Sequence, residues 1–263
     1  MKEKVVFFDI DGTLLDHDKK VPASTRQTLD DLREAGHHVA IATGRAPFMF
    51  KDLREELGID SFVSFNGQYV VFEGEVIYKN PLKTETLEKV LEFSEETKHP
   101  LVFMNHETMM ASESNHPYIE ESMGSLKFPH PEVNPSFFNE AEIYQTLLFC
   151  KTGEEEPYKK YKDLNFIRWH ELATDILPTG GSKAEGIKKL VERLKFDRED
   201  IYAFGDELND LEMIKYAGTG VAMGNANPKL KEIADYITRP VDDNGIQYAV
   251  QQLGLLSSKA EKI

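Results

Sequence analysis

Cysteine is nearly absent from this chain of 263 residues, and acidic residues outnumber basic ones. Cys150 is the only cysteine, which excludes an internal disulfide and a cysteine metal cluster. Lys and Arg together number 31 against 46 Asp and Glu, so the net charge is −15. That charge argues against a surface for nucleic acid or anionic membrane, because both require a cationic footprint.

Long apolar runs are missing as well. The longest stretch without Asp, Glu, Lys or Arg, residues 244–258, spans about 15 residues and is interrupted by Gly and Gln, whereas a membrane span needs about 20 apolar residues. Asp9 interrupts the first apolar run before a signal-peptide core could form. We therefore expect a cytoplasmic protein with no membrane and no nucleic-acid partner.

The composition that remains is typical of a folded globular protein. Hydrophobic residues make up 40% of the chain and charged residues 29%, which excludes a disordered or fibrous protein. At roughly 150 residues per domain, the length is a little under two average domains. A chain of this length buries a core without covalent staples.

Short apolar runs alternate with amphipathic segments in the first 65 residues. Ser24 or Thr25 is expected to cap the first helix, and Gly36 suits its end. The resulting β-α-β-α-β pattern predicts a parallel sheet with helices on both faces. The expected elements are strand Lys4–Ile10, helix Ser24–Gly36, strand Val39–Thr43, helix Pro47–Leu57 and strand Phe62–Phe65.

The pattern then changes to hairpins and short strands. Asn66-Gly67 and Glu73-Gly74 are turn dipeptides. A proline-rich stretch, Pro117–Pro135, is expected to be a loop. The expected elements of this part are strands Tyr69–Phe72 and Val76–Tyr78, helix Thr84–Lys98, and strands Leu101–Met104, Tyr144–Cys150, Phe166–Trp169 and Leu172–Leu177.

The first pattern returns from Ser182, so an α/β domain is interrupted and then resumed. Both junctions carry proline, at Pro81 and Pro178, which suits hinges between two domains. We therefore predict a doubly wound parallel-sheet α/β core at 1–81 and 179–263 with an inserted α+β domain at 82–178. The resumed elements are helix Ser182–Leu194, strand Ile201–Phe204, helix Glu207–Tyr216, strand Gly220–Met223 and helix Gly245–Leu253.

One motif with apparent chemistry has a simpler explanation. Gly180-Gly181-Ser182-Lys183-Ala184 resembles the G-x-S-x-G turn of serine hydrolases, with Ala in the last place. Because Ser182 immediately precedes a predicted helix, we interpret it as a helix cap and not as a nucleophile.

Chemistry-bearing residues follow several predicted strands. Asp9-Ile10-Asp11-Gly12-Thr13 comes directly after the first strand, and Thr43-Gly44-Arg45 ends the second. Lys183 begins a helix, and Gly205–Asp210 (GDELND) follows a later strand. Ligands of open α/β sheets bind beyond the carboxyl ends of strands. Each motif alone could be an ordinary turn or cap, but together they suit a hard cation and a phosphoryl group attacked by a carboxylate.

These motifs resemble those of the haloacid dehalogenase superfamily, and in particular its Cof-like phosphatases with a type IIB cap. DIDGT at Asp9–Thr13, ATGR at Ala42–Arg45, GGSK at Gly180–Lys183 and GDELND at Gly205–Asp210 occur in the family's order. SFNG at Ser64–Gly67 and a late DNG around Asn244 also match. The resemblance covers essentially the whole chain and implies a Rossmann-like core with an inserted cap.

The resemblance also implies a mechanism and a set of roles. Asp9 would be the nucleophile of an aspartyl-phosphate, and Asp11 the general acid and base. The family function would be Mg²⁺-dependent hydrolysis of phosphate monoesters of small metabolites, such as sugar or cofactor phosphates. Mg²⁺ would be held by Asp9, the Asp11 backbone carbonyl, Asp206 and Asp210, and the phosphate by Ile10, Thr43, Gly44, Lys183 and Asn209.

Several alternatives remain open at this point. A phosphomutase of the same fold would carry the same motifs, and a non-catalytic phosphate-binding protein could keep the scaffold. A signalling receiver domain is disfavoured, because it is about half this length and is phosphorylated on a later strand. The sequence allows a monomer or a homodimer. Trp169-His170 and the Pro117–Pro135 stretch are candidates for substrate contact, although a core aromatic is the favoured interpretation of Trp169.

Overall fold

The computed structural model of the chain describes residues 2–256, so the end of the segment predicted as core, 257–263, lies outside it. The chain divides into two compact units. The large unit comprises the described residues of Met1–Arg45, Phe50–Tyr78 and Ser182–Ile263, and the small unit comprises Ala46–Met49 and Lys79–Gly181.

An eight-stranded sheet forms the centre of the large unit, in the order β13-β12-β11-β1-β2-β3-β4-β5. Neighbouring strands from β13 to β3 pair in parallel, whereas β3 and β4 pair antiparallel. The predicted parallel α/β core is thereby confirmed. The strands are β1 (Val5–Phe8), β2 (His38–Ala42), β3 (Phe62–Ser64), β4 (Tyr69–Phe72), β5 (Glu75–Lys79), β11 (Ile201–Gly205), β12 (Thr219–Ala222) and β13 (Tyr236–Ile237).

The central strands are uniformly apolar because both of their faces are buried. All four residues of β1 are at most 1% exposed, and the ring of Phe8 stacks on Phe204 of β11 at 4.9 Å between centroids. The predicted hairpin turn at Glu73-Gly74 is present, with positive φ at both residues, and connects β4 to β5.

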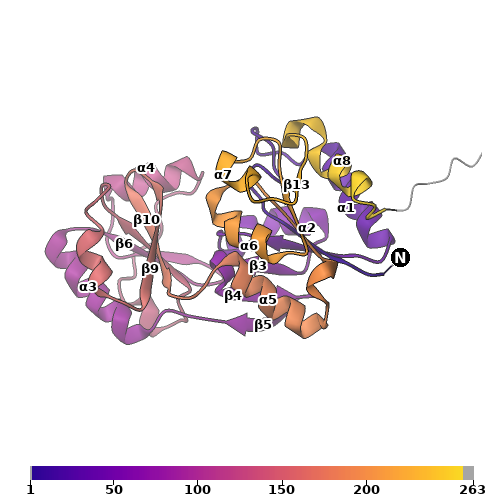
Figure 1. Cartoon of the computed structure of the whole chain (residues 1–263). Helices are drawn as coiled ribbons and strands as arrows, with labels where there is room; N and C mark the ends of the chain where they lie inside the picture. Colours follow the sequence, from indigo (N-terminus) through magenta and orange to yellow (C-terminus); the bar gives the residue numbers. More distant parts are fainter. Residues whose placement is uncertain (1, 257–263) are drawn as a thin grey trace, which may run out of the picture. The chain divides into compact units, whose positions relative to one another are not determined.

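Helices pack on both faces of this sheet. Helix α1 packs against α8, and α5 packs against α6; Figure 1 shows the two pairs on opposite sides. The helices are α1 (Ala23–Glu34), α2 (Lys51–Leu57), α5 (Lys183–Leu194), α6 (Leu211–Tyr216), α7 (Pro228–Lys231) and α8 (Gly245–Gln252). The expected helices at Pro47–Leu57 and Glu207–Tyr216 each begin as a 3-10 turn, at Pro47–Phe50 and Leu208–Asp210.

The expected cap of α1 is wrong, whereas that of α5 is confirmed. Pro22, which makes no side-chain capping bond, precedes α1, and Ser24 and Thr25 lie inside the helix. Proline supplies the extended backbone before the first turn and has no N–H to satisfy. At α5 the Ser182 hydroxyl accepts a hydrogen bond from the Glu185 N–H at 3.3 Å.

The small unit is built on a five-stranded antiparallel sheet, in the order β7-β6-β8-β10-β9. One sheet face carries a core that includes Leu101, Phe103, Leu148 and Ile176, together with Leu87 and Val90 of the helix α3. The elements are α3 (Thr84–Thr97), β6 (Leu101–Met104), β7 (Met109–Ala111), α4 (Pro117–Ser125), β8 (Gln145–Phe149), β9 (Leu164–His170) and β10 (Ala173–Pro178).

Helix α4 corrects the expectation that Pro117–Pro135 is a loop. Pro117 is its first residue, where a helix needs no N–H donor, and the His116 side chain accepts a hydrogen bond from the Tyr118 N–H. Among all helices in residues 2–256, not one combines the length and apolar character that a membrane crossing requires.

Candidate active site

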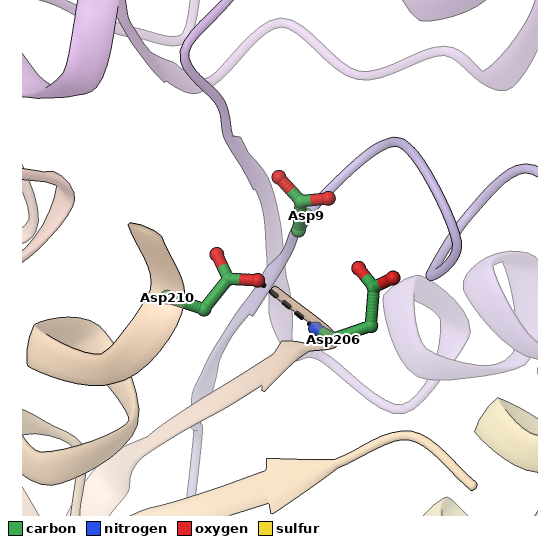
Figure 2. Close-up of side chains that lie close together, drawn as sticks. All are labelled: Asp9, Asp206 and Asp210. Carbon is green, nitrogen blue, oxygen red and sulfur yellow. Dashed lines mark hydrogen bonds between the residues drawn. The ribbon is translucent and has the colours of Figure 1, made fainter. Parts of the chain in front are cut away.

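Three aspartates converge at the carboxyl ends of the neighbouring strands β1 and β11. Asp9 directly follows β1, and Asp206 directly follows β11. Asp210 ends the 3-10 turn after Asp206. Because β1 and β11 pair in parallel from Val5↔Ile201 to Phe8↔Phe204, their ends coincide. Figure 2 shows the three carboxylates close together on the same side of the strand ends; all are buried, and one oxygen of each lies within 4.8 Å of the others.

A buried lysine joins this group from the first turn of α5. The Nζ of Lys183 donates to Oδ1 of Asp9 at 2.5 Å and to Oδ1 of Asp210 at 2.6 Å. The side chain of Lys183 is fully buried. Ser182 caps the same helix, so the helix start fixes the point from which the lysine reaches the strand ends. The group therefore contains three carboxylates and one ammonium, which contacts two of them.

Besides pairing with Lys183, the Asp210 carboxylate holds the backbone of the loop that follows β11. Its Oδ2 accepts the backbone N–H of Asp206 at 2.9 Å, drawn as a dashed line in Figure 2, and that of Glu207 at 3.0 Å. Both of its oxygens are thus engaged by the protein. Asp206 is held more loosely, since its Oδ1 accepts a hydrogen bond from the Thr13 hydroxyl at 3.3 Å.

Glycine is required where the Asp9–Thr13 loop passes this group. Gly12 has φ +79°, and a Cβ built there would lie 2.1 Å from Oδ2 of Asp206. Both the backbone conformation and the space therefore exclude a side chain. The close approach brings the loop directly against the Asp206 carboxylate.

The single ammonium of Lys183 does not balance the charge of the three ionised carboxylates. Burial, opposed by Lys183, raises the pKa of Asp9 to about 7. Burial, with Asp9 and Asp210 nearby, raises the pKa of Asp206 to about 8. Oxygen ligands of this kind suit a hard divalent cation, whose charge would favour the ionised carboxylates. The three aspartates could therefore hold a metal ion.

The Asp11 carboxylate is held outside this group. Arg45 binds it with two hydrogen bonds, of 2.9 Å from Nε and 2.6 Å from Nη2, and Lys19 Nζ binds it at 2.7 Å. Burial favours the neutral form, but Arg45 and Lys19 outweigh it and lower the pKa of Asp11.

Lys19 is a site residue that the sequence analysis missed. The Asp16 side chain turns the loop back by accepting the N–H groups of Asp18 and Lys20, both at 2.9 Å. Lys19 itself has φ +61°. The D-x-D spacing at Asp16 was a signal for this turn, but not for the contact of Lys19 with Asp11.

The loop after β2 carries the predicted phosphate ligands Thr43 and Gly44. The Thr43 hydroxyl is buried and accepts the Arg45 N–H at 3.1 Å. Asn66 packs against Gly44, where a built Cβ would lie 3.1 Å from both amide heteroatoms of Asn66. Among the other predicted ligands, Ile10 is fully buried after β1 and Asn209 is exposed next to Asp210.

Comparisons with known proteins agree with this architecture. A family model of haloacid dehalogenase-like hydrolases matches residues 6–250. YkrA of Bacillus subtilis (strain 168), a proposed phosphatase, is 58% identical over 256 residues, covering 97% of this chain and 100% of YkrA.

Solved structures give the same result. A hypothetical protein of Geobacillus kaustophilus HTA426 is 56% identical with a TM-score of 0.94, covering 97% of this chain and 100% of that one. The sugar phosphatase BT4131, of subclass IIB of the same superfamily, is 29% identical with a TM-score of 0.82, covering 96% of this chain and 100% of BT4131.

Proposed function

Because this chain belongs to the haloacid dehalogenase-like hydrolases, we propose that it hydrolyses phosphate monoesters of small metabolites in a Mg²⁺-dependent reaction. Sugar phosphates and cofactor phosphates are the substrate classes, and the similarity to the sugar phosphatase BT4131 supports the first. The observation that carries the proposal is the buried group of Asp9, Asp206, Asp210 and Lys183 at the ends of β1 and β11.

Asp9 is the proposed nucleophile. Its carboxylate oxygen attacks phosphorus, a new O–P bond forms, and the bond from phosphorus to the alcohol oxygen breaks. Lys183, which contacts Asp9, binds a phosphoryl oxygen. The Ile10 N–H, the Thr43-Gly44 loop and Asn209 bind the others.

Mg²⁺ would be held by Asp9, Asp206 and the Asp11 backbone carbonyl, with Asp210 in support. When bound, it supplies the positive charge that lets an ionised Asp9 approach a phosphate dianion. The donor set fits this role, since the group holds three buried carboxylates and a single ammonium, which pairs with Asp9 and Asp210.

Asp11 is the proposed general acid and base. It gives a proton to the leaving alcohol oxygen. It then takes a proton from the water that attacks the phosphorus of the aspartyl-phosphate, which breaks the bond between phosphorus and the Asp9 oxygen and releases inorganic phosphate. The ion pairs with Arg45 and Lys19 keep the Asp11 carboxylate ionised, as the base step requires. For the acid step, these ion pairs must loosen so that the carboxyl group can hold a proton.

The small unit is the proposed substrate-selecting cap. In this proposal residues 82–178 form an inserted domain, and 1–81 with 179–263 form the catalytic core. All proposed catalytic and phosphate-binding residues belong to the large unit, which leaves the small unit available for recognition of the organic part of the substrate.

Replacement of the nucleophile tests the proposal. Asp9→Asn should lower phosphate release from p-nitrophenyl phosphate by about 10³-fold or more with Mg²⁺ present, because an amide is a poor nucleophile. Asp52→Asn, an exposed position in α2, is the matched control and should retain full activity. Activity of Asp9→Asn within tenfold of the unmodified protein would place the nucleophile elsewhere.

A further inference from the structure

Three consecutive residues after β3 have positive φ, in a turn to which the proposed mechanism gives no role. The turn, Phe65–Gly67, has φ +50° at Phe65, +51° at Asn66 and +97° at Gly67. Positive φ is uncommon for residues other than glycine, and for a residue as bulky as phenylalanine it is a steric outlier. Strained backbone of this kind persists where the surrounding structure holds it, and it is concentrated at functional sites. The turn is therefore a candidate for a role in the site.

One side of the turn holds the loop after β2, which carries the proposed phosphate ligands Thr43 and Gly44. The Asn66 N–H donates to the Thr43 carbonyl at 3.1 Å, and the Phe65 N–H donates to the Arg45 carbonyl at 3.2 Å. Since the carbonyl and the N–H of a trans peptide point in opposite directions, the bond to the Thr43 carbonyl turns the Gly44 N–H away from the turn. In the part of the chain that the structure describes, no atom accepts a hydrogen bond from this N–H, so it is available to a phosphoryl oxygen.

The other side of the turn contacts the start of α5, which carries Lys183. A Cβ built on Gly67 would lie 2.0 Å from the Ser182 carbonyl oxygen, and one built on Gly186 would lie 2.8 Å from the Gly67 Cα. Neither position has room for a side chain, so the two backbones pack directly against each other. The turn therefore lies between the two elements that carry phosphate ligands, the loop after β2 and the first turn of α5.

The Asn66 side chain packs against Gly44 at a cost in stability. Asn66 is 5% exposed, and a Cβ built on Gly44 would lie 3.1 Å from both of its amide heteroatoms. No described residue makes a hydrogen bond with Oδ1 of Asn66. A buried amide oxygen without a donor is destabilising, and positive φ is less favourable for asparagine than for glycine. Glycine would have neither cost, so stability alone does not explain an asparagine at this position.

We propose that Asn66 is a positioning residue for phosphate binding, which acts through Gly44. Its turn sets the separation between the loop after β2 and the start of α5. Its side chain supports Gly44 on the side opposite to the one where the N–H meets a phosphoryl oxygen. The inference rests on the proposed function, because it assumes that Gly44 and Lys183 bind the phosphoryl group. Asn66 itself does not touch the substrate in this proposal.

Asn66→Gly tests the side chain without straining the turn, because glycine adopts positive φ freely. With Mg²⁺ present, the dissociation constant of inorganic phosphate, measured by calorimetric titration, should rise about tenfold, since the hydrogen bond from Gly44 to a charged oxygen is weakened. KM for p-nitrophenyl phosphate should rise by a similar factor while kcat stays within about threefold, because ground-state binding is what is lost. A merely structural role would instead lower the urea midpoint and leave the dissociation constant and KM unchanged.

Asn66→Ala adds a second variant that does not depend on the first. Alanine removes the same side chain and also disfavours the positive φ that the turn requires. The dissociation constant of inorganic phosphate should therefore rise at least as much as in Asn66→Gly. A constant that stays at the value of the unmodified protein in either variant would overturn the proposal.

Asn115→Gly is the matched control. Asn115 has φ +53°, close to that of Asn66, but it is exposed and belongs to the small unit. Its replacement should leave the dissociation constant of inorganic phosphate within about twofold, as is usual for a surface substitution. An equal rise in Asn115→Gly would attribute the effect to a general loosening of the chain and overturn the positioning role.

Failure of this inference and failure of the proposed function differ in outcome. If the unmodified protein binds inorganic phosphate but releases none from any phosphate ester, the proposed hydrolysis is refuted, and the calorimetric comparison still tests Asn66. If the unmodified protein hydrolyses phosphate esters, and Asn66→Gly and Asn66→Ala bind inorganic phosphate as tightly as it does, the positioning role alone is refuted.

Discussion

At the scale of single residues, the site depends on a glycine that brings two loops together. Gly12 has positive φ and leaves no room for a Cβ beside Asp206. Gly74, in the turn before β5, has the same φ of +79° but nothing within 4 Å of its built Cβ. The two positions therefore separate backbone strain from steric conflict at the site.

Replacing each glycine by alanine makes this separation measurable. Both Gly12→Ala and Gly74→Ala should lower the free energy of unfolding by about 1–2 kcal/mol, the cost of a left-handed conformation for a residue with Cβ. Only Gly12→Ala should also lose activity, by about tenfold or more, because its Cβ displaces Asp206. Chemical denaturation and phosphate release measure the two effects, and equal activity in both variants would contradict the steric argument.

The proposed Mg²⁺ requirement should depend on pH through the Asp9 and Asp206 carboxylates. Asp9 and Asp206 have pKa values raised to about 7 and about 8, so below these values protons compete with a metal ion. The Mg²⁺ concentration for half-maximal activity should therefore fall as pH rises from 6 to 8.5. EDTA should abolish activity and Mg²⁺ restore it. A half-activation concentration that is constant with pH, or full activity in EDTA, would contradict the assignment.

Residue positions differ in how far the sequence predicts them. Asp9, Asp206 and Lys183 follow from strand ends and a helix start, which parallel pairing brings to one edge. The partners of Asp11 do not follow in the same way. Arg45 lies at a strand end, but Lys19 reaches Asp11 through a side-chain turn at Asp16, and no residue spacing encodes the direction of that turn.

At the scale of elements, the starts of α5 and α1 show that a serine near a predicted helix start does not always cap the helix. Ser182 caps α5 with its hydroxyl. Ser24 has the residue type expected for a cap, but it lies within α1, and its hydroxyl makes no hydrogen bond with any residue among 2–256. The same residue type therefore has two different energetic roles.

Alanine substitution distinguishes these roles. Ser182→Ala should lower the free energy of unfolding by about 1 kcal/mol, since one helix N–H loses its acceptor. Ser24→Ala should stay within about 0.5 kcal/mol of the unmodified protein. Urea denaturation measures both. Loss of all activity in Ser182→Ala with unchanged stability would revive Ser182 as a nucleophile.

Strands with a continuous apolar run were predictable, whereas the strand β7 and the helix α4 were not. The apolar runs that became β1, β6 and β11 needed only pattern and length. β7 has three residues, too few for a periodic signal. α4 begins at Pro117. The several prolines of this stretch favoured the prediction of a loop, although proline is favourable at the first position of a helix.

At the scale of the whole molecule, the three site aspartates and the chain's only tryptophan belong to different units. Asp9, Asp206 and Asp210 belong to the large unit, and Trp169 belongs to the small unit. Each unit has its own sheet. The effect of a ligand on the stability of one unit can therefore be measured separately from its effect on the other unit.

Saturating Mg²⁺ should stabilise mainly the large unit. At a Mg²⁺ concentration a hundred times the dissociation constant, binding raises the free energy of unfolding of the unit that binds the ion by about 2.7 kcal/mol. The urea midpoint followed by far-ultraviolet circular dichroism should rise more than the midpoint followed by Trp169 fluorescence. Asp206→Asn should remove the difference. Equal shifts of both midpoints would show that the two units unfold as one.

The pairing of β1 with β11 has a consequence for the order in which the newly made chain can fold. β1 leaves the ribosome well before its partner β11, which begins only at Ile201. All five strands of the small-unit sheet lie between Leu101 and Pro178, so they leave the ribosome earlier. On the nascent chain, the small unit can close its sheet while β1 still exposes one hydrogen-bonding edge. The aspartate group is therefore assembled only after β11 has been translated.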